Sequence, residues 1–540
     1  MVDRKKGSPA ETGEPAKYMM IWTVGIYVFL MMTVYPLYYK NGYYDICDAK
    51  WDFFKYVSAV FAAAVIMLFI WYLGSFLAEK KAAEFLSNAY KSTNVTDRFA
   101  FAYLVVCCIS SVITPYRQNV IWGYYGWYMG LIAQISFVVI YFLVSRFWRW
   151  DTINLLLFLL ASFAVFFLGV IMRFRIDPLD LHAGLDEYSI SYFISTLGQA
   201  TWYSSYMCIV MPLGLVAYWC AEKLWARIAF GIFCAMSFMT AVTQNSDSAY
   251  PAMFCMFFIL FWISFDSDEK FLRAVECVII ALCSFKAIGF IQTVCADRAV
   301  MPDALSVFMS RSRTTTVMLV LAAVSYLLMR FVVFKRTGFH IASVKRLRTV
   351  MLIGVAAGAV LTVLYMILNS TGKLPERYSL SAGYLNFNDT WGNNRGVSWR
   401  CSMEAFMKGS IVRKLFGAGP DCFAEYVYED YRVDFANILG GHIVQTCAHN
   451  EWINSLINVG LFGLTAYFGT FISSFRDCMR HAEDRPYLYG VAMAIAAYIL
   501  HNSFCYQQII CTPVIFILMG MAQSVIRFGY ERRQGRERLI

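Results

Sequence analysis

Apolar runs of membrane-spanning length recur along this chain, and they limit what it can fold into. A run of about 18 apolar residues can cross a bilayer as a helix, and a soluble core cannot use many such runs. Of the 540 residues, 59% are hydrophobic and 15% are charged, whereas soluble chains carry about 25% charged residues. The sequence therefore predicts an all-α polytopic membrane protein.

We expect about 14 transmembrane helices, because that many runs approach the required length. The first run follows Arg4, Lys5, Lys6 and Lys17. It is too long, and too poor in a small-residue cleavage site, for a removable signal peptide, so we expect a retained span. The approximate limits of the expected spans are 18–38, 53–77, 99–114, 125–144, 152–171, 202–220, 227–243, 249–265, 271–292, 314–334, 349–368, 450–475, 487–505 and 508–527.

The basic residues predict the orientation of these spans. Lys and Arg concentrate in both tails and in alternate short loops, and such loops stay in the cytoplasm. Both termini are therefore expected inside, and the one long polar segment is expected outside. This division predicts a cytoplasmic tail (1–17), a first transmembrane part (18–368), an extracytoplasmic loop (369–449), the last spans (450–527) and a basic cytoplasmic tail (528–540).

The formal net charge of +10 does not indicate a nucleic-acid partner. The basic residues lie in short loops, and no aromatic-interleaved basic patch occurs. Most of the 16 cysteines sit in apolar runs, where free cysteine acts as a small hydrophobic residue. Cys401, Cys422 and Cys447 share the long loop, and two of them could pair.

The most informative stretch lies where the long loop enters the twelfth expected span. At helical spacing Asn450, Asn454 and Asn458 form one polar stripe, which should face protein or water rather than lipid. His449 would sit at the first turn or cap of that helix, where the positive end of the helix dipole disfavours imidazolium. A neutral imidazole is what a general base requires. The alternative is a histidine that only caps a span.

A second stretch, residues 393–400, has the sequence Asn-Asn-Arg-Gly-Val-Ser-Trp-Arg. Apolar residues follow it at helical spacing, and Asn394 is a plausible N-cap. Arg395 would then lie at a helix start, where backbone N–H groups and a guanidinium can hold phosphate oxygens together. The alternative is an ordinary surface arginine.

Together these residues resemble the O-antigen ligase and polymerase superfamily. The signature is His449-Asn450, then nine residues, then Gly460-x-x-Gly463. Upstream, the Arg-x-x-x-Trp of residues 395–399 and the Phe-Gly-Ala-Gly-Pro-Asp of residues 416–421 resemble the same family's outer loop in order and spacing. Residues 195–206 resemble its mid-chain outer segment, so the likeness covers roughly residues 190–475.

The resemblance implies a transferase of the bacterial inner membrane. Its donor would be a glycan linked to a polyprenyl diphosphate, and its acceptor would be a hydroxyl of a glycan or of a lipid. Membrane lipids would surround the protein. His449 would be the base, Arg395 a diphosphate contact and Asn450 a neighbouring substrate contact. Ligase and polymerase reactions need the same base and the same diphosphate site, so only their shared chemistry is predicted.

One departure from the family pattern concerns the second cation. Members of the family often carry Ser-Arg near the outer end of a mid-chain span, where this chain has Ser246-Asp247. Arg311, Arg313 and Arg377, all outside in the predicted topology, are the candidates to replace the missing arginine.

The predicted reaction needs no cofactor and no metal. A diphosphate is a good leaving group whose charge cations can hold. The outer loops show no convincing ligand set, although His442 could join His449 as a metal ligand. The predicted topology places Asp266 and Asp268 on the cytoplasmic side, at the end of a span, where we expect solvent-exposed capping residues.

Two other functions compete with this hypothesis. A transferase using polyprenyl monophosphate sugars would need an acidic base in the first outer loop, where Asp45 and Asp48 lie. A transporter or flippase of lipid-linked glycans should place charged residues within its spans, and only Lys286 stands out as deep.

Overall fold

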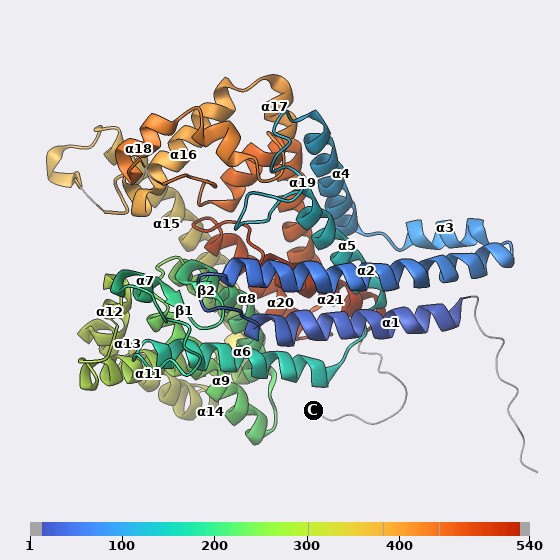
Figure 1. Ribbon diagram of the computed structural model, residues 1–540. Helices are drawn as coiled ribbons and strands as arrows, with labels where there is room; N and C mark the ends of the chain where they lie inside the picture. The colour runs from blue at the N-terminus through green and yellow to red at the C-terminus, as the bar shows by residue number, and fades with distance from the viewer. Residues whose placement is uncertain (1–12, 301, 382, 442, 530–540) are drawn as a thin grey trace, which may run out of the picture.

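The computed structural model describes residues 13–529 except 301, 382 and 442 (Figure 1). His442, most of the predicted N-terminal tail and nearly all of the C-terminal tail therefore lie outside the described residues. The described chain is mostly helical. Its only strands are β1 (Phe193–Ile194) and β2 (Gly198–Gln199), which pair antiparallel. The predicted all-α fold class is confirmed.

Helices follow one another along the chain. The N-terminal half consists of α1 (Glu14–Phe29), a π-helical turn (Leu30–Val34), a 3-10 turn (Tyr35–Leu37), α2 (Ile46–Ala78), α3 (Ala82–Lys91), α4 (Val95–Ile113), α5 (Leu131–Phe147), α6 (Thr152–Met172), α7 (Glu187–Tyr192), α8 (Ala200–Cys220), α9 (Leu224–Thr243), α10 (Ala249–Ser264) and α11 (Asp268–Val294).

The C-terminal half continues in the same way. It consists of α12 (Ala304–Arg311), α13 (Arg313–Leu328), a π-helical turn (Met329–Val333), α14 (Phe334–Arg336), a 3-10 turn (Ile341–Val344), α15 (Leu347–Ser370), a 3-10 turn (Glu376–Tyr378), α16 (Trp391–Lys408), α17 (Ile411–Phe416), a π-helical turn (Ala424–Tyr428), α18 (Arg432–Leu439), α19 (Glu451–His481), α20 (Leu488–His501) and α21 (Thr512–Phe528).

Within the described residues, ten helices are long and apolar enough to cross a membrane. Four shorter apolar helices, α5, α10, α20 and α21, fall on the predicted runs 125–144, 249–265, 487–505 and 508–527. The expected third span begins earlier than predicted, because Asn94 and Asp97 form a reciprocal capping box at the start of α4.

Burial differs sharply among these helices. In α8, 89% of the most apolar 18-residue stretch is buried, and this helix packs against α9, α10 and α20. In the spans that contain α13 and α15, no residue of the corresponding 18-residue stretch is buried. An apolar helix without protein cover is soluble only in lipid, so the exposure of α13 and α15 itself supports a membrane setting.

The segment between α15 and α19 folds into short helices. Figure 1 shows α16, α17 and α18 together on one side of the helical bundle. Of these, α16 and α18 share a small apolar core that includes Val397, Phe423, Val427 and Phe435 and reaches Ile457 on α19. This segment is therefore folded against the transmembrane helices.

All 16 cysteines of the chain are free, including the three in this segment that could have paired.

Candidate active site

A cavity of about 620 Å³ brings together residues from the separate motifs. It opens between the first turn of α8, the turn joining α9 to α10, the start of α12 and the segments that precede α16 and α19. Its lining includes Thr201, Asn245, Ser246, Asp247, Ser248, Asp303, Tyr384, Trp391, Arg395, His449 and Phe504.

His449 lies one residue before the N-cap of α19. Its backbone is left-handed, with φ of 49°, and its ring packs edge-on against Tyr506 at a centroid distance of 5.0 Å. No described residue hydrogen-bonds its imidazole. Burial, and then the charge of Arg395, lower the pKa of His449 from 6.5 to about 3. The ring is therefore neutral near physiological pH, through these two causes rather than through the helix dipole alone.

Arg395 follows an unusual backbone turn. Gly392, Asn393 and Asn394 are all left-handed, with φ near 60°, a region that only glycine and, less readily, asparagine adopt at low cost. Asn394 is therefore not the expected N-cap but part of this turn. The right-handed part of α16 begins at Arg395, and a Cβ at Gly396 would overlap the carbonyl oxygen of Asn388.

Two backbone carbonyls hold the Arg395 guanidinium. Its Nε donates to the Phe504 oxygen at 3.1 Å and its Nη1 to the Gly392 oxygen at 2.6 Å. Burial lowers the pKa of Arg395, and no carboxylate of the described chain forms a salt bridge with it. Its Nη2 group makes no hydrogen bond within the described residues. An anion that entered the cavity would meet a positioned cation with free donors.

The residues 416–421 position the start of α19. Gly417 and Gly460 are both left-handed, and a Cβ on either would overlap backbone of the other segment. The amides of Ala418 and Gly419 donate to carbonyl oxygens of α19 at 2.9 and 2.8 Å. Asp421 accepts hydrogen bonds from two backbone amides of the α4–α5 connection. This motif therefore fixes the position of the segment that carries His449.

The asparagine stripe of α19 serves the same segment. Asn450 is the N-cap, and its side-chain oxygen accepts from the amides of Trp452 and Ile453. Asn454 accepts from the Ala448 amide at 3.2 Å. Asn458 is buried at the kink before Gly460. Asn450 does not line the cavity, so its visible role is to shape the backbone beside His449.

The three arginines proposed to replace the missing cation do not line this cavity. Arg311 ends α12, Arg313 begins α13, and both are exposed. Arg377 is exposed and lies over the Tyr378 ring at 4.6 Å. Among the described residues, one arginine, Arg395, lines the cavity.

The residues of the competing hypotheses also have partners elsewhere. Asp45 accepts a hydrogen bond from Asn41 at 2.8 Å, and Asp48 accepts from the hydroxyls of Tyr125 and Tyr128. Neither aspartate lines the cavity. Lys286 donates to the Ser312 carbonyl oxygen at 2.7 Å and so secures the turn between α12 and α13.

Asp247, which marks the departure from the family pattern, does line the cavity. Its Oδ2 accepts from the Tyr384 hydroxyl at 2.8 Å. Burial, and then the negative charge of Asp303, raise the pKa of Asp247 to about 6. Sequence reasoning missed Asp303, which caps α12, and Ser248, because neither belongs to a motif.

Arg173, another residue that sequence reasoning missed, supports this wall from behind. It is 3% exposed and donates to the carbonyl oxygens of Ile190, Ser191, Thr243 and Gln244. It thereby ties the α7 segment to the end of α9, directly before the turn that lines the cavity.

Within the described residues no group of three or more His, Cys, Asp or Glu side chains could hold a metal ion.

The fold and the cavity define a multi-pass membrane protein with a buried polar site. Residues 299–468 match the family model described as O-antigen ligase, which confirms the resemblance predicted from the motifs. The matched segment is similar to an O-antigen ligase domain, and it contains Asp303, Arg395 and His449. Asp247 and Ser248 lie before it. No curated protein matches the chain.

Proposed function

We propose that this protein transfers a glycan from a polyprenyl diphosphate carrier to an acceptor hydroxyl on the extracytoplasmic side of the membrane. The observation that carries the proposal is that Arg395 and His449, which come from separate motifs, line one cavity. A guanidinium with free donors suits a diphosphate, and a neutral imidazole suits the removal of a hydroxyl proton.

In the proposed step the acceptor O–H bond breaks and its proton goes to a ring nitrogen of His449. The acceptor oxygen then bonds to the anomeric carbon of the donor. The bond from that carbon to the diphosphate oxygen breaks, and the electron pair leaves with the diphosphate. Arg395 stabilises the charge that develops there. Neither a metal nor a cofactor is needed for any part of this exchange.

The two residues are also coupled electrostatically. The charge of Arg395 is one cause of the low pKa of His449. A bound diphosphate would offset that charge, and the pKa of His449 would rise toward its ordinary value. A base is most effective when its pKa lies near the working pH. We therefore expect His449 to become an effective base when the donor is in place.

The test is Arg395→Lys, compared with the matched control Arg400→Lys on the same helix. Arg400 bonds to Asp389, Glu404 and Asp434 and does not line the cavity. Lysine keeps the charge at residue 395 but loses the planar fork.

Transfer is measured in nanodiscs with the donor titrated at saturating acceptor. We expect the KM for the donor to rise about tenfold or more for Arg395→Lys, as for the loss of a charge-assisted hydrogen bond, and to stay within about twofold for the control. Equal effects of the two substitutions would remove Arg395 from the site.

A further inference from the structure

One wall of the cavity carries two carboxyl groups and a serine hydroxyl. It consists of the turn between α9 and α10, with Asp247 and Ser248, and of Asp303 at the start of α12. Asp247 Oδ1 and Asp303 Oδ2 are enclosed, and the two carboxyl groups lie close enough to interact with each other. Two adjoining carboxyl groups make this wall acidic, so it favours hydrogen-bond donors and cations over anions.

A chain of hydrogen bonds behind the wall sets the polarity of Ser248. Glu451 is buried, and its carboxylate accepts from the Asn502 amide. Because an amide nitrogen only donates, the Asn502 oxygen must face His501, whose Nδ1 lies 3.0 Å away. The proton of the imidazole is therefore on Nδ1, and Nε2 is left as an acceptor.

The acceptor Nε2 of His501 lies 3.0 Å from Ser248 Oγ and 2.8 Å from Ser204 Oγ. Ser204 has a second acceptor, the Thr201 carbonyl oxygen at 3.1 Å, so Ser248 can give its proton to His501. Because Ser246 Oγ lies 2.8 Å from Ser248 Oγ, the Ser246 hydroxyl then donates to Ser248, whose remaining lone pair can face the cavity. Ser248 is the N-cap residue of α10 but makes no capping hydrogen bond, so capping does not account for its hydroxyl.

Aromatic rings complete the same space. Tyr384, Trp391 and Phe504 line the cavity, with Trp391 at ring-centroid distances of 6.4 Å from Tyr384 and 6.3 Å from Phe504. Such rings offer apolar surface beside polar tips. A sugar has apolar ring faces and hydroxyl groups at its edges, and both features match this combination.

We propose that this wall is a glycan subsite that binds the hydroxyl or ammonium groups of a sugar and rejects sugars that carry a carboxylate or phosphate. The inference rests on the proposed function and adds to it the charge class of the sugar. Asp247 and Asp303 repel a negative group, while Arg395, which also lines the cavity, receives the diphosphate. The sugar and the diphosphate would thus bind to different parts of the same cavity, the sugar beside the aspartates and the diphosphate beside Arg395.

The experiment measures binding of four probes to the full chain in nanodiscs. Three are trisaccharides of glucose, glucosamine and glucuronic acid, and the fourth is inorganic pyrophosphate. We expect the glucosamine and glucose trisaccharides to bind more tightly than the glucuronic acid trisaccharide by about tenfold or more, since a like-charge contact replaces hydrogen bonds. Equal or tighter binding of the acidic trisaccharide would overturn the proposal.

Variants locate the effect. Ser248→Ala and Ser204→Ala both remove a hydroxyl from His501, but only Ser248 lines the cavity. Ser248→Ala should weaken glucose trisaccharide binding about fivefold or more, Ser204→Ala should leave it within twofold, and Asp247→Asn should admit the acidic trisaccharide. Equal losses in both serine variants would contradict the proposal.

Pyrophosphate separates this inference from the proposed function. Its binding should depend on Arg395 and be unchanged in Ser248→Ala. A protein that binds pyrophosphate through Arg395 but does not bind the glucose trisaccharide overturns the glycan subsite alone. A protein that binds the trisaccharides as expected, but binds pyrophosphate independently of Arg395, overturns the diphosphate assignment and leaves the glycan subsite supported.

Discussion

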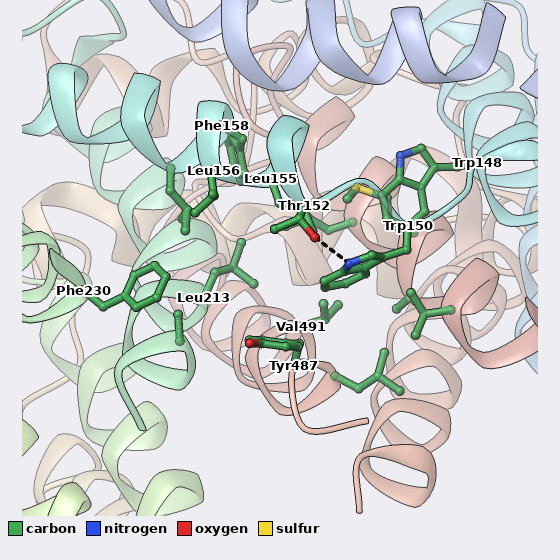
Figure 2. Close-up of a pocket in the computed structure, with 17 residues that line it drawn as sticks. Trp148, Trp150, Thr152, Leu155, Leu156, Phe158, Leu213, Phe230, Tyr487 and Val491 are labelled. Atoms are coloured by element: carbon green, nitrogen blue, oxygen red, sulfur yellow. Dashed lines mark hydrogen bonds between the residues drawn. The ribbon is translucent and has the colours of Figure 1, made fainter. Parts of the chain in front are cut away.

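Two cavities lie toward opposite ends of the same helices, and they differ in chemistry. The polar cavity includes Thr201 in the first turn of α8 and Phe504 beyond the end of α20. The second cavity, of about 110 Å³, is almost entirely apolar and includes Leu213 of α8 and Val491 of α20. Figure 2 shows the aromatic and aliphatic side chains around it, with one hydrogen bond, from Trp150 to Thr152.

The difference between the cavities comes from which parts of the chain line them. Helix bodies line much of the apolar cavity, whereas the polar cavity is lined mainly by turns and helix starts. Backbone and polar groups at such places can reach a ligand, because helix bodies already bond their own amides. Chemistry is therefore concentrated where the helices end, and the predictions below test whether function divides in the same way.

The pH dependence of transfer offers a sensitive test of the polar cavity. A general base must be deprotonated, so the rate falls about tenfold per pH unit below its pKa. In the free enzyme the pKa of His449 is about 3, and kcat/KM for the donor should show no acidic loss from this group above about pH 4.

In the donor complex the diphosphate offsets the charge of Arg395, so the acidic limb of kcat should lie at higher pH than that of kcat/KM. Full pH profiles of both constants, measured in nanodiscs, test this expectation. Coincident limbs would show that the donor does not change the basicity of His449, and the proposed coupling would then be wrong.

A substitution in the apolar cavity should have a smaller and different effect. Leu213→Ala removes apolar packing from a partly buried position, so we expect a loss of about 1–3 kcal/mol of stability. The transfer rate and both KM values should stay within about twofold. Thermal unfolding and transfer assays of the same preparation make the comparison. A specific rise in donor KM would mean that the apolar cavity also holds part of the substrate.

The smallest expected effect is that of a chelator. The proposed reaction uses only His449 and Arg395, and within the described residues no group of three or more His, Cys, Asp or Glu side chains could hold a metal ion. Transfer with excess EDTA should therefore proceed at an unchanged rate. If activity is lost and magnesium or manganese restores it, the metal-free mechanism is wrong and an acidic base such as Asp45 gains support.

Much of the architecture could be predicted because membrane helices are encoded locally. Long apolar runs reveal themselves by length, and the helices lie close to the predicted limits. His449 and Arg395 could be singled out because each lies in a distinctive motif, and the structure places both in one cavity. Even Asp247 was marked, through its departure from the family pattern.

The rest of the cavity depends on contacts that no local pattern announces. Asp303 and Ser248 approach the cavity only after α12 and α10 have packed, and Arg173 acts through four carbonyls from two distant segments. The left-handed turn before Arg395 was also missed, because Gly-Asn-Asn is compatible with many backbone conformations. Arg311, Arg313 and Arg377 were plausible by charge alone, yet exposure on other parts of the fold separates them from this cavity.

The most direct test of the account is transfer by His449→Ala, with His481→Ala as the control. His481 is exposed at the far end of α19. Removing a general base should slow transfer by about 10²–10⁴-fold, while pyrophosphate binding and thermal stability are retained and the control stays within about twofold of the parent. A well-folded His449→Ala protein that transfers glycan at a near-normal rate would contradict the central claim.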